Sequence, residues 1–570
     1  MTVETCFGFV CFIPLDASGQ KFFGFSEFLA ALALMVLAWT IADVRYQFRV
    51  RTAPIPLQSV TFSVVAGVGV LTLLTDLWRA EQWLVPHGTL LTPASWQALL
   101  GALFLLTFLA WAWFAFIQPS TYSRFNAERY AKTLYHFVLK GSSNDLAVIA
   151  DELTYSVKSI VHHACDSITL SRYRSQSDEK KRIPPKVARY ANDLLLLIAD
   201  KRLCRVIVES SPGTLMAIFQ EMSFAEKYDI QLGIFARNIV NEAILNKNSF
   251  LFHEAEGYES GLMGYHKPLS QAMFSNYHMI EVVDTMLDPA FPSSSKWDAS
   301  QWGAYSRIVL MAFRSFVEAG SVGHSFTLYR AMKNIENVGA EIYKLNGVPN
   351  ISWDNDAMAQ LRVVVDFIND AVNILEEKDV PDRRYLRVRG NQPYNESLYD
   401  HLASMIFEVV LAASSVATPV WECWLVQHNT VWTNIFGSTR LANHAGRIVQ
   451  FKARRLLYEE ILRMNKFANF QGARILGFCL NVMGLKERND NQGKSSRALQ
   501  KVVLAWTKKY YIELHNYNFR VGEACLMGGI TYDPDHKRIV KTYLAEGLRR
   551  EPQYVYLELD PVAPNSGTPP

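Results

Sequence analysis

The sequence lacks the features that assign many chains to an enzyme class. Its 570 residues contain only seven cysteines, and no two of them are spaced as Cys-x-x-Cys. We interpret those beyond residue 160 as reduced thiols of a protein core. The 57 basic and 54 acidic residues nearly cancel, so the charge indicates no bulk polyanion as a partner. No internal repeat of solenoid length is evident.

Two partial motifs for phosphate and metal are present, and both are incomplete. The Gly-Lys-Ser at 493–495 ends like a phosphate-binding loop, but Arg488 stands where that loop needs a glycine. His162 and Asp166 lie one helical turn apart, which is half of a zinc site, and no second pair of ligands completes it. We expect a helix-surface or core cluster there, and the sequence predicts no metal and no cofactor.

A third motif is a loose resemblance. Arg129 and His136 resemble the arginine and histidine of HEPN-type ribonucleases, which are separated by six residues. That motif usually has a polar residue after the arginine, whereas this chain has Tyr130. We interpret Arg129 as an interfacial anchor, and the resemblance leaves a nuclease as an alternative.

Long apolar runs are present, and they lie in the first fifth of the chain. Three of them are long enough to cross a bilayer, at about 22–42, 57–75 and 96–117. The third contains no Asp, Glu, Lys or Arg, and at about 1.5 Å per residue it matches the roughly 30 Å hydrocarbon core. No basic segment precedes the first run and no small-residue cleavage site follows it, so we expect no signal peptide. The sequence predicts an N-terminal three-helix transmembrane module over 1–121.

Lysine and arginine flank these runs unevenly. One side carries most of them: Arg45, Arg49, Arg51, Arg124, Arg129, Lys132 and Lys140. The positive-inside rule then places the N-terminus outside and everything after Ile117 in the cytoplasm, which indicates the inner membrane. Trp78, Trp83 and Trp96 flank the outer face, as an aromatic belt would.

The remainder of the chain has a helical pattern. From Tyr122 onward apolar residues recur at three and four positions, which predicts a mainly α fold with a large α-helical cytoplasmic domain. We divide it into a juxtamembrane region, 122–290, a second helical region, 291–560, and a disordered tail, 561–570. The last ten residues include four prolines.

Few segments depart from that pattern. Only 204–208, 385–388 and 554–559 have the composition of strands. The stretch 402–420 is apolar, but Glu408 and Pro419 interrupt it, so we expect no fourth span.

The second apolar run has one face of small residues: Ser59, Ser63, Ala66 and Gly67. Small residues let helices approach closely, so this face could be a packing seam with the first and third runs. The alternative is a face that lines or gates a pore. Three helices cannot enclose a water-filled path, so a pore requires a homo-oligomer.

Two arginine clusters are candidates for ligand binding. Arg440, Arg447 and Arg454 recur with Lys452 on one predicted helix, and Arg383 and Arg384 begin a second cluster beside a loop. Either cluster could bind a nucleotide, an oligonucleotide or a phospholipid headgroup. The alternative is a solvated or ion-paired face.

Two further segments leave alternatives open. The segment 253–278, rich in Gly, Tyr and His, is either a functional turn or a packed loop. Cys6 and Cys11 lie outside under the predicted topology, where they form a disulfide or belong to an apolar segment in the headgroup region.

The architecture, rather than a motif, indicates the function. A large cytoplasmic domain on a minimal membrane module predicts a prokaryotic oligomeric ion channel or membrane-disrupting effector that the domain gates. Antiphage effectors are commonly built in this way, so by analogy we expect that role. The expected partners are the lipid bilayer, further copies of the chain, and an anionic nucleotide or oligonucleotide or a cytoplasmic protein. The alternatives are a membrane-tethered hydrolase or nuclease and a membrane-anchored scaffold.

Overall fold

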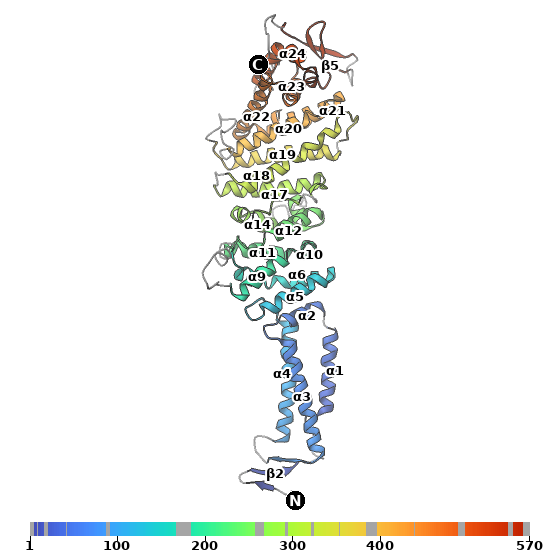
Figure 1. Ribbon diagram of the computed structural model, residues 1–570, viewed down its shortest axis with the longest axis vertical. Coiled ribbons are helices and arrows are strands. Elements are labelled where there is room, and N and C mark those ends of the chain that lie inside the picture. The colour runs from blue at the N-terminus through green and yellow to red at the C-terminus, as the bar shows by residue number, and fades with distance from the viewer. Residues whose placement is uncertain are drawn as a thin grey trace. The chain divides into compact units, whose positions relative to one another are not determined.

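A computed structural model describes most of the chain as helices (Figure 1). It describes residues 5–7, 10–15, 21–41, 43–86, 92–166, 184–256, 267–290, 294–320, 324–352, 354–382, 396–437, 439–487, 496–544 and 551–561. The predicted mainly α class is confirmed at this level. The chain divides into two compact units, Met1–Glu242 and Ala243–Pro570.

Three apolar helices pack together in the first unit. They are α1 (Phe25–Ile41), α3 (Leu57–Ala80) and α4 (Pro93–Ala112), which a π-helical turn, η1 (Trp113–Ile117), continues. Side chains from all three form one apolar cluster: Phe28, Met35, Val65, Val68, Leu100 and Phe104. By length and composition α3 and α4–η1 could each cross a membrane, and α1 could be part of a third crossing if it is joined to the next helix.

The outward surface of these helices is apolar. Only 28% of the most apolar window of α3 and 22% of that of α4–η1 are buried. The exposed large side chains include Leu34, Leu37, Phe62, Val70, Leu73, Leu74, Leu99, Leu105, Leu106 and Leu109. A soluble protein rarely exposes an apolar patch of this extent, whereas a lipid-facing helix is apolar on all sides.

The two ends of the apolar helices differ. At one end α1 meets α2 (Val44–Thr52) at a bend of 108°. At the other end lies a three-stranded antiparallel sheet (Figure 1), of β1 (Thr5–Phe7), β2 (Val10–Pro14) and β3 (Leu84–Pro86). Its register places Cys6 opposite Cys11.

The rest of the first unit is a set of short amphipathic helices. They are α5 (Ala127–Lys140), α6 (Ser143–Thr154), α7 (Val157–His163), α9 (Lys186–Leu197), α10 (Lys201–Ser210), α11 (Pro212–Ala225) and α12 (Gly233–Leu245). Side chains cap the starts of α6, where Ser142 and Asp145 form a capping box, and of α10, where Asp200 accepts two backbone N–H groups.

The second unit is helical with one terminal sheet. Its helices are α13 (Phe250–Glu256), α14 (Pro268–Phe274), α15 (Tyr277–Val283), α17 (Ala299–Glu318), α18 (Phe326–Val338), η2 (Gly339–Leu345), α19 (Asp356–Glu377), α20 (Leu398–Ala413), α21 (Val420–Trp424), η4 (Leu425–Gly437), η5 (Thr439–Leu441), α22 (His444–Arg463), α23 (Phe470–Met483), α24 (Arg497–Tyr517) and α25 (Phe519–Ala524). The strands β4 (Ile530–Asp533), β5 (Arg538–Tyr543) and β6 (Gln553–Glu558) form an antiparallel sheet in that order. Long helices pack in sequence, α17 on α19, α19 on α20 and α20 on α22.

Of the three predicted strands, one is confirmed and one is wrong. The segment 554–559 coincides with β6 to within a residue. The segment 204–208 is helical, because Asp200 accepts the backbone N–H groups of Arg202 and Leu203 and so starts α10 there. The segment 385–388 lies outside the described residues.

Two other expectations concern the second unit. Most of the stretch 402–420 lies in α20, whose side chains are mostly buried within the protein, and it is not among the candidate spans of the described residues. The division expected near 290 falls inside the second unit, since the two units divide at Glu242.

Candidate functional site: the joint at helix α2

Helix α2 lies between the apolar helices α1 and α3 in the chain, and it packs against the amphipathic helices of the first unit. It starts at Asp43, whose side chain accepts the N–H of Val44 at 2.6 Å, and it packs on η1, α5 and α6. One face of α2 is buried, with Phe48, Arg49 and Thr52 pointing inward. We call this contact region the joint; its residues are Phe48, Arg49, Thr52, Asn126, Arg129, Tyr130 and Glu152.

A buried ion pair lies at the centre of the joint. Arg49 donates Nε–H to Oε2 of Glu152 at 2.9 Å and Nη2–H to Oε1 at 2.8 Å. Glu152 is 1% exposed and Arg49 9%. A third bond runs from Nη1 of Arg49 to the carbonyl of Phe116 at 3.2 Å, which ties the end of η1 to the same guanidinium. Planar bidentate contacts of this type are among the strongest polar contacts in proteins.

The charges around this pair are matched. Arg45 adds a longer contact to Glu152 at 3.5 Å and one to Asp151 at 3.6 Å. The hydrogen bonds that Glu152 accepts raise the pKa of Arg49 above its ordinary value. The Arg49 guanidinium therefore stays protonated at physiological pH, and both side chains of the pair have partners.

The C-terminal end of α2 is capped by residues from beyond the third apolar helix. Asn126, which is buried, donates to the carbonyl of Thr52 at 2.6 Å. Arg129 donates to the carbonyls of Ala53 at 2.8 Å and Pro54 at 2.6 Å. A cation at the end of a helix also opposes the helix dipole.

These contacts bear on the ribonuclease resemblance. The Arg129 guanidinium is used as a cap, and His136 is exposed on α5. The structure therefore gives Arg129 a structural contact that accounts for it without catalysis.

Aromatic side chains complete the joint. The Phe48 ring is fully buried and lies edge-on to Tyr130 at 5.4 Å and to Phe137 at 6.0 Å between centroids. Tyr122 stands edge-on to Tyr130 at 5.6 Å. Such contacts add to the hydrophobic packing that holds α2 on α5.

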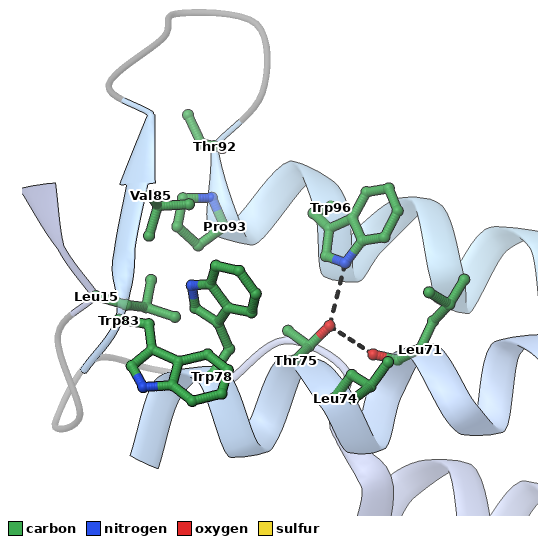
Figure 2. A pocket seen from close by; sticks show the side chains of 10 residues that line it. All are labelled: Leu15, Leu71, Leu74, Thr75, Trp78, Trp83, Val85, Thr92, Pro93 and Trp96. Atoms are coloured by element: carbon green, nitrogen blue, oxygen red, sulfur yellow. Dashed lines mark hydrogen bonds between the residues drawn. The ribbon is translucent and has the colours of Figure 1, made fainter. Parts of the chain in front are cut away.

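An apolar pocket lies at the opposite end of α3 and α4, beside the sheet. Its volume is 470 Å³ (Figure 2), and it is lined by Leu15, Leu71, Leu74, Thr75, Trp78, Trp83, Val85, Thr92, Pro93 and Trp96. Trp96 donates its indole N–H to Thr75 at 3.1 Å, and the Thr75 hydroxyl donates to the carbonyl of Leu71 at 2.6 Å. The three tryptophans expected at the outer face are thus gathered around one pocket that has no ionisable lining group.

The structure places the predicted small-residue face outward. Ser59, Ser63, Ala66 and Gly67 are exposed, and a Cβ added to Gly67 would meet nothing within 4 Å. The packing seam is formed instead by the other face of α3. There an added Cβ on Gly69 would come within 2.7 Å of the Phe28 ring. Among the described residues the predicted face is therefore not the seam with the first and third helices, and the pore alternative stays a prediction.

The three arginines predicted to share one helix lie on two, Arg440 on η5 and Arg447 and Arg454 on α22, and they have separate partners. Arg440 lies 3.5 Å from Asp366, and Arg447 donates to the carbonyl of Ala442 at 3.1 Å. Arg454 donates to the carbonyl of Gln450 and is partly buried, which lowers its pKa to about 10.

The second predicted cluster, Arg383 and Arg384, lies outside the described residues. The sequence groups one lysine with the first cluster, and the structure buries it. Lys452 is fully buried and lies 2.7 Å from Asp400 and 3.1 Å from Asp382.

The histidine cluster has local contacts. His163 Nδ1 lies 2.7 Å from the carbonyl of Ser159, and the rings of His162 and His163 stand edge to face. Over the described ranges, no group of three or more His, Cys, Asp or Glu side chains is arranged to hold a metal ion. The loop at 493–495 and residues 257–266 of the Gly/Tyr/His segment are outside those ranges.

The sequence analysis counted Arg49 only among the basic residues that flank the apolar runs, and it did not identify Glu152 as its partner. The available signal was an acidic residue beside the apolar positions Ile149 and Leu153 of a helical pattern.

Comparison with known proteins does not extend this picture: no protein-family model, no curated protein and no solved structure matches the chain.

Proposed function

We propose that the protein is an oligomeric integral membrane protein of a prokaryotic inner membrane, in which the helical domain gates an ion-conducting path or a disruption of the bilayer. In this proposal the N-terminus is outside and the helical domain is cytoplasmic, and the biological role is defence against phage. The alternative functions remain those of a tethered hydrolase or nuclease and of a scaffold.

Membrane crossing is supported by the surface of the first unit. Two helices are long enough to cross, and their exposed side chains are apolar along their length. Helix α1 packs against both through Phe28 and Met35, so it would cross with them. Tryptophans line the pocket at one end of these helices, and arginines lie on α2 at the other end. Both residue types are typical of the interfaces between membrane and water.

The observation that carries the gating proposal is the buried Arg49–Glu152 pair. It ties α6, in the amphipathic part of the unit, to α2, and α2 is joined to α1 by the bend. Because interiors are close-packed, a shift of α6 would move α2 rather than be absorbed between them. A ligand or partner that favours one arrangement of the helical domain could in this way bias the apolar helices.

Oligomerisation is supported by the exposed small-residue face. Among the described residues Ser59, Ser63 and Gly67 are exposed, a Cβ added to Gly67 would meet nothing within 4 Å, and lipid gains little from serine or glycine. Facing another copy, the same residues would allow close approach of α3 helices around an axis.

The experiment is a paired measurement on the full-length protein. A reporter fused after Leu139 should be cytoplasmic and one inserted near Gly88 should be outside. Ion flux or membrane leakage on induction should then depend on the spans. Finding both reporters on one side refutes the topology, and correct topology without flux under any activating condition favours the scaffold.

The nuclease alternative has its own outcome. Nuclease activity in the full-length protein that is lost with His136→Ala, but retained when flux is abolished, would favour the enzyme. Because His136 is exposed, this substitution should leave folding intact.

A further inference from the structure

A small cavity with a mixed polar and apolar lining lies where four helices of the first unit converge. Its volume is 210 Å³, and it is lined by Trp39 of α1, Tyr46 and Arg51 of α2, Gln58 of α3 and Trp111 of α4, among others. The rings of Trp39 and Trp111 are 6.3 Å apart between centroids and form an aromatic wall. This volume is below the roughly 300–1,000 Å³ of sites for drug-sized ligands, so it suits a single polar group better than a whole ligand.

The charge of the cavity is uncompensated. Of the three arginines on α2, Arg45 and Arg49 are paired with acidic residues of α6. Arg51 makes no ion pair with any described residue, and its guanidinium carbon lies 6.0 Å from the centroid of the Phe137 ring. No lining residue is acidic. An anionic group in the cavity would therefore meet a cation that the protein does not neutralise.

A second observation points to an acceptor. The indole N–H of Trp39, a lining residue, is buried and has no hydrogen-bond partner among the described residues. More than about nine in ten buried polar groups in native proteins have a partner. A bound oxygen atom of a ligand would supply the missing acceptor.

We propose that this cavity binds the phosphate headgroup of an anionic phospholipid. The inference rests on the proposed membrane crossing, because α1, α3 and α4 then end here, where hydrocarbon gives way to headgroups. Basic pockets between spans on the cytoplasmic side are a recurrent site for such headgroups. The acyl chains would lie against the exposed apolar side chains of the same helices, for example Leu37 and Val60. Inorganic phosphate lacks these chains and would bind far more weakly.

The test is lipid binding by the full-length protein in detergent, read by native mass spectrometry with added phosphatidylglycerol, phosphatidylcholine or inorganic phosphate. We expect phosphatidylglycerol to bind preferentially and Arg51→Gln to weaken it about tenfold or more, as for a lost charge-assisted contact. Trp39→Phe, which keeps a ring and removes the N–H, should weaken it about 2- to 10-fold. The matched control is Arg124→Gln, an exposed arginine on the same flank that does not line the cavity.

Equal losses for Arg51→Gln and Arg124→Gln would overturn the proposal, because they would indicate general attraction to a basic surface. Competition by inorganic phosphate at equal concentration would also overturn it, since the site would then take free phosphate. The binding measurement does not depend on flux. A protein that conducts no ions but binds phosphatidylglycerol through Arg51 would refute the gating proposal and leave this inference intact.

Discussion

Breaking the Arg49–Glu152 pair should release α2 from α6. Arg49→Met leaves Glu152, which is 1% exposed, without its bidentate partner. Removing one partner of a buried pair costs about 3–5 kcal/mol. Arg45 remains 3.5 Å from the same carboxylate and keeps part of the compensation, so we expect about 3 kcal/mol. The double variant Arg49→Met with Glu152→Leu leaves no buried charge and should cost much less than the single one.

Amide hydrogen exchange of the full-length protein measures this locally. A loss of about 3 kcal/mol corresponds to about 100-fold faster exchange of α2 amides that open locally. Exchange in α17 and α19 of the second unit should not change and is the internal control. If the single and double variants exchange equally fast, the unpaired charge is not the cause, and the reasoning from the ion pair is refuted. In the flux assay the single variant should insert normally but fail to respond to activation.

Four further predictions follow from other contacts. Gly69→Leu should destabilise the packing of α3 on α1, because the leucine side chain would meet Phe28. Gly67→Leu should leave the monomer intact and lower only oligomer size and flux. Thermal unfolding and oligomer size measure this, and an equal loss of monomer stability in the two variants would contradict it. Burial and the neighbouring His324 lower the pKa of His401 to about 4, although Glu396 lies 3.5 Å from it. The neutral imidazole therefore contributes folding stability that is fully present above pH 6.5 and is lost as pH falls toward 4. In unfolding measurements at matched pH the wild type should lose up to about 3 kcal/mol more stability than His401→Gln over that window, and parallel curves would refute this prediction. Lys452→Met leaves Asp400 and Asp382 buried without a cation and should cost about 3–5 kcal/mol, while the exposed control Lys466→Met should cost less than about 0.5 kcal/mol in denaturant unfolding. If the α22 arginines hold an anionic activator, Arg447→Ala with Arg454→Ala should abolish flux at unchanged oligomer size, and wild-type flux would assign them to a surface with local partners only.

The apolar helices could be predicted from sequence because their signal is strong and local. A run without charge over 96–117 has few alternatives to a buried or lipid-facing helix, and the structure has Pro93–Ile117 there. The strand expected at 204–208 was wrong because the composition of a short segment is a weaker signal. Val206, Ile207 and Val208 favour a strand by composition, but the cap at Asp200 and the burial of one helical face outweigh that preference.

The joint could not be predicted, because its residues come together only in the fold. Arg49 and Glu152 are 103 positions apart, and neither stands out in its own segment. A buried carboxylate differs from a surface one only in what surrounds it, and a single sequence does not give that environment. The outward direction of Gly67 was ambiguous for the same reason: both faces of α3 carry small residues, and only the position of Phe28 selects Gly69 for the seam.

The three arginines of α2 show why a charge pattern does not define a role. As flanking charges Arg45, Arg49 and Arg51 are equivalent, since the positive-inside rule depends on their number and place. In the structure they differ: Arg49 is buried and paired, Arg45 is a partly exposed second contact to the same carboxylate, and Arg51 faces a cavity without an acidic partner. Reversing all three to glutamate would therefore change topology, the joint and the proposed headgroup site together. Single neutral substitutions separate these effects, because each removes one contact while two flanking charges remain.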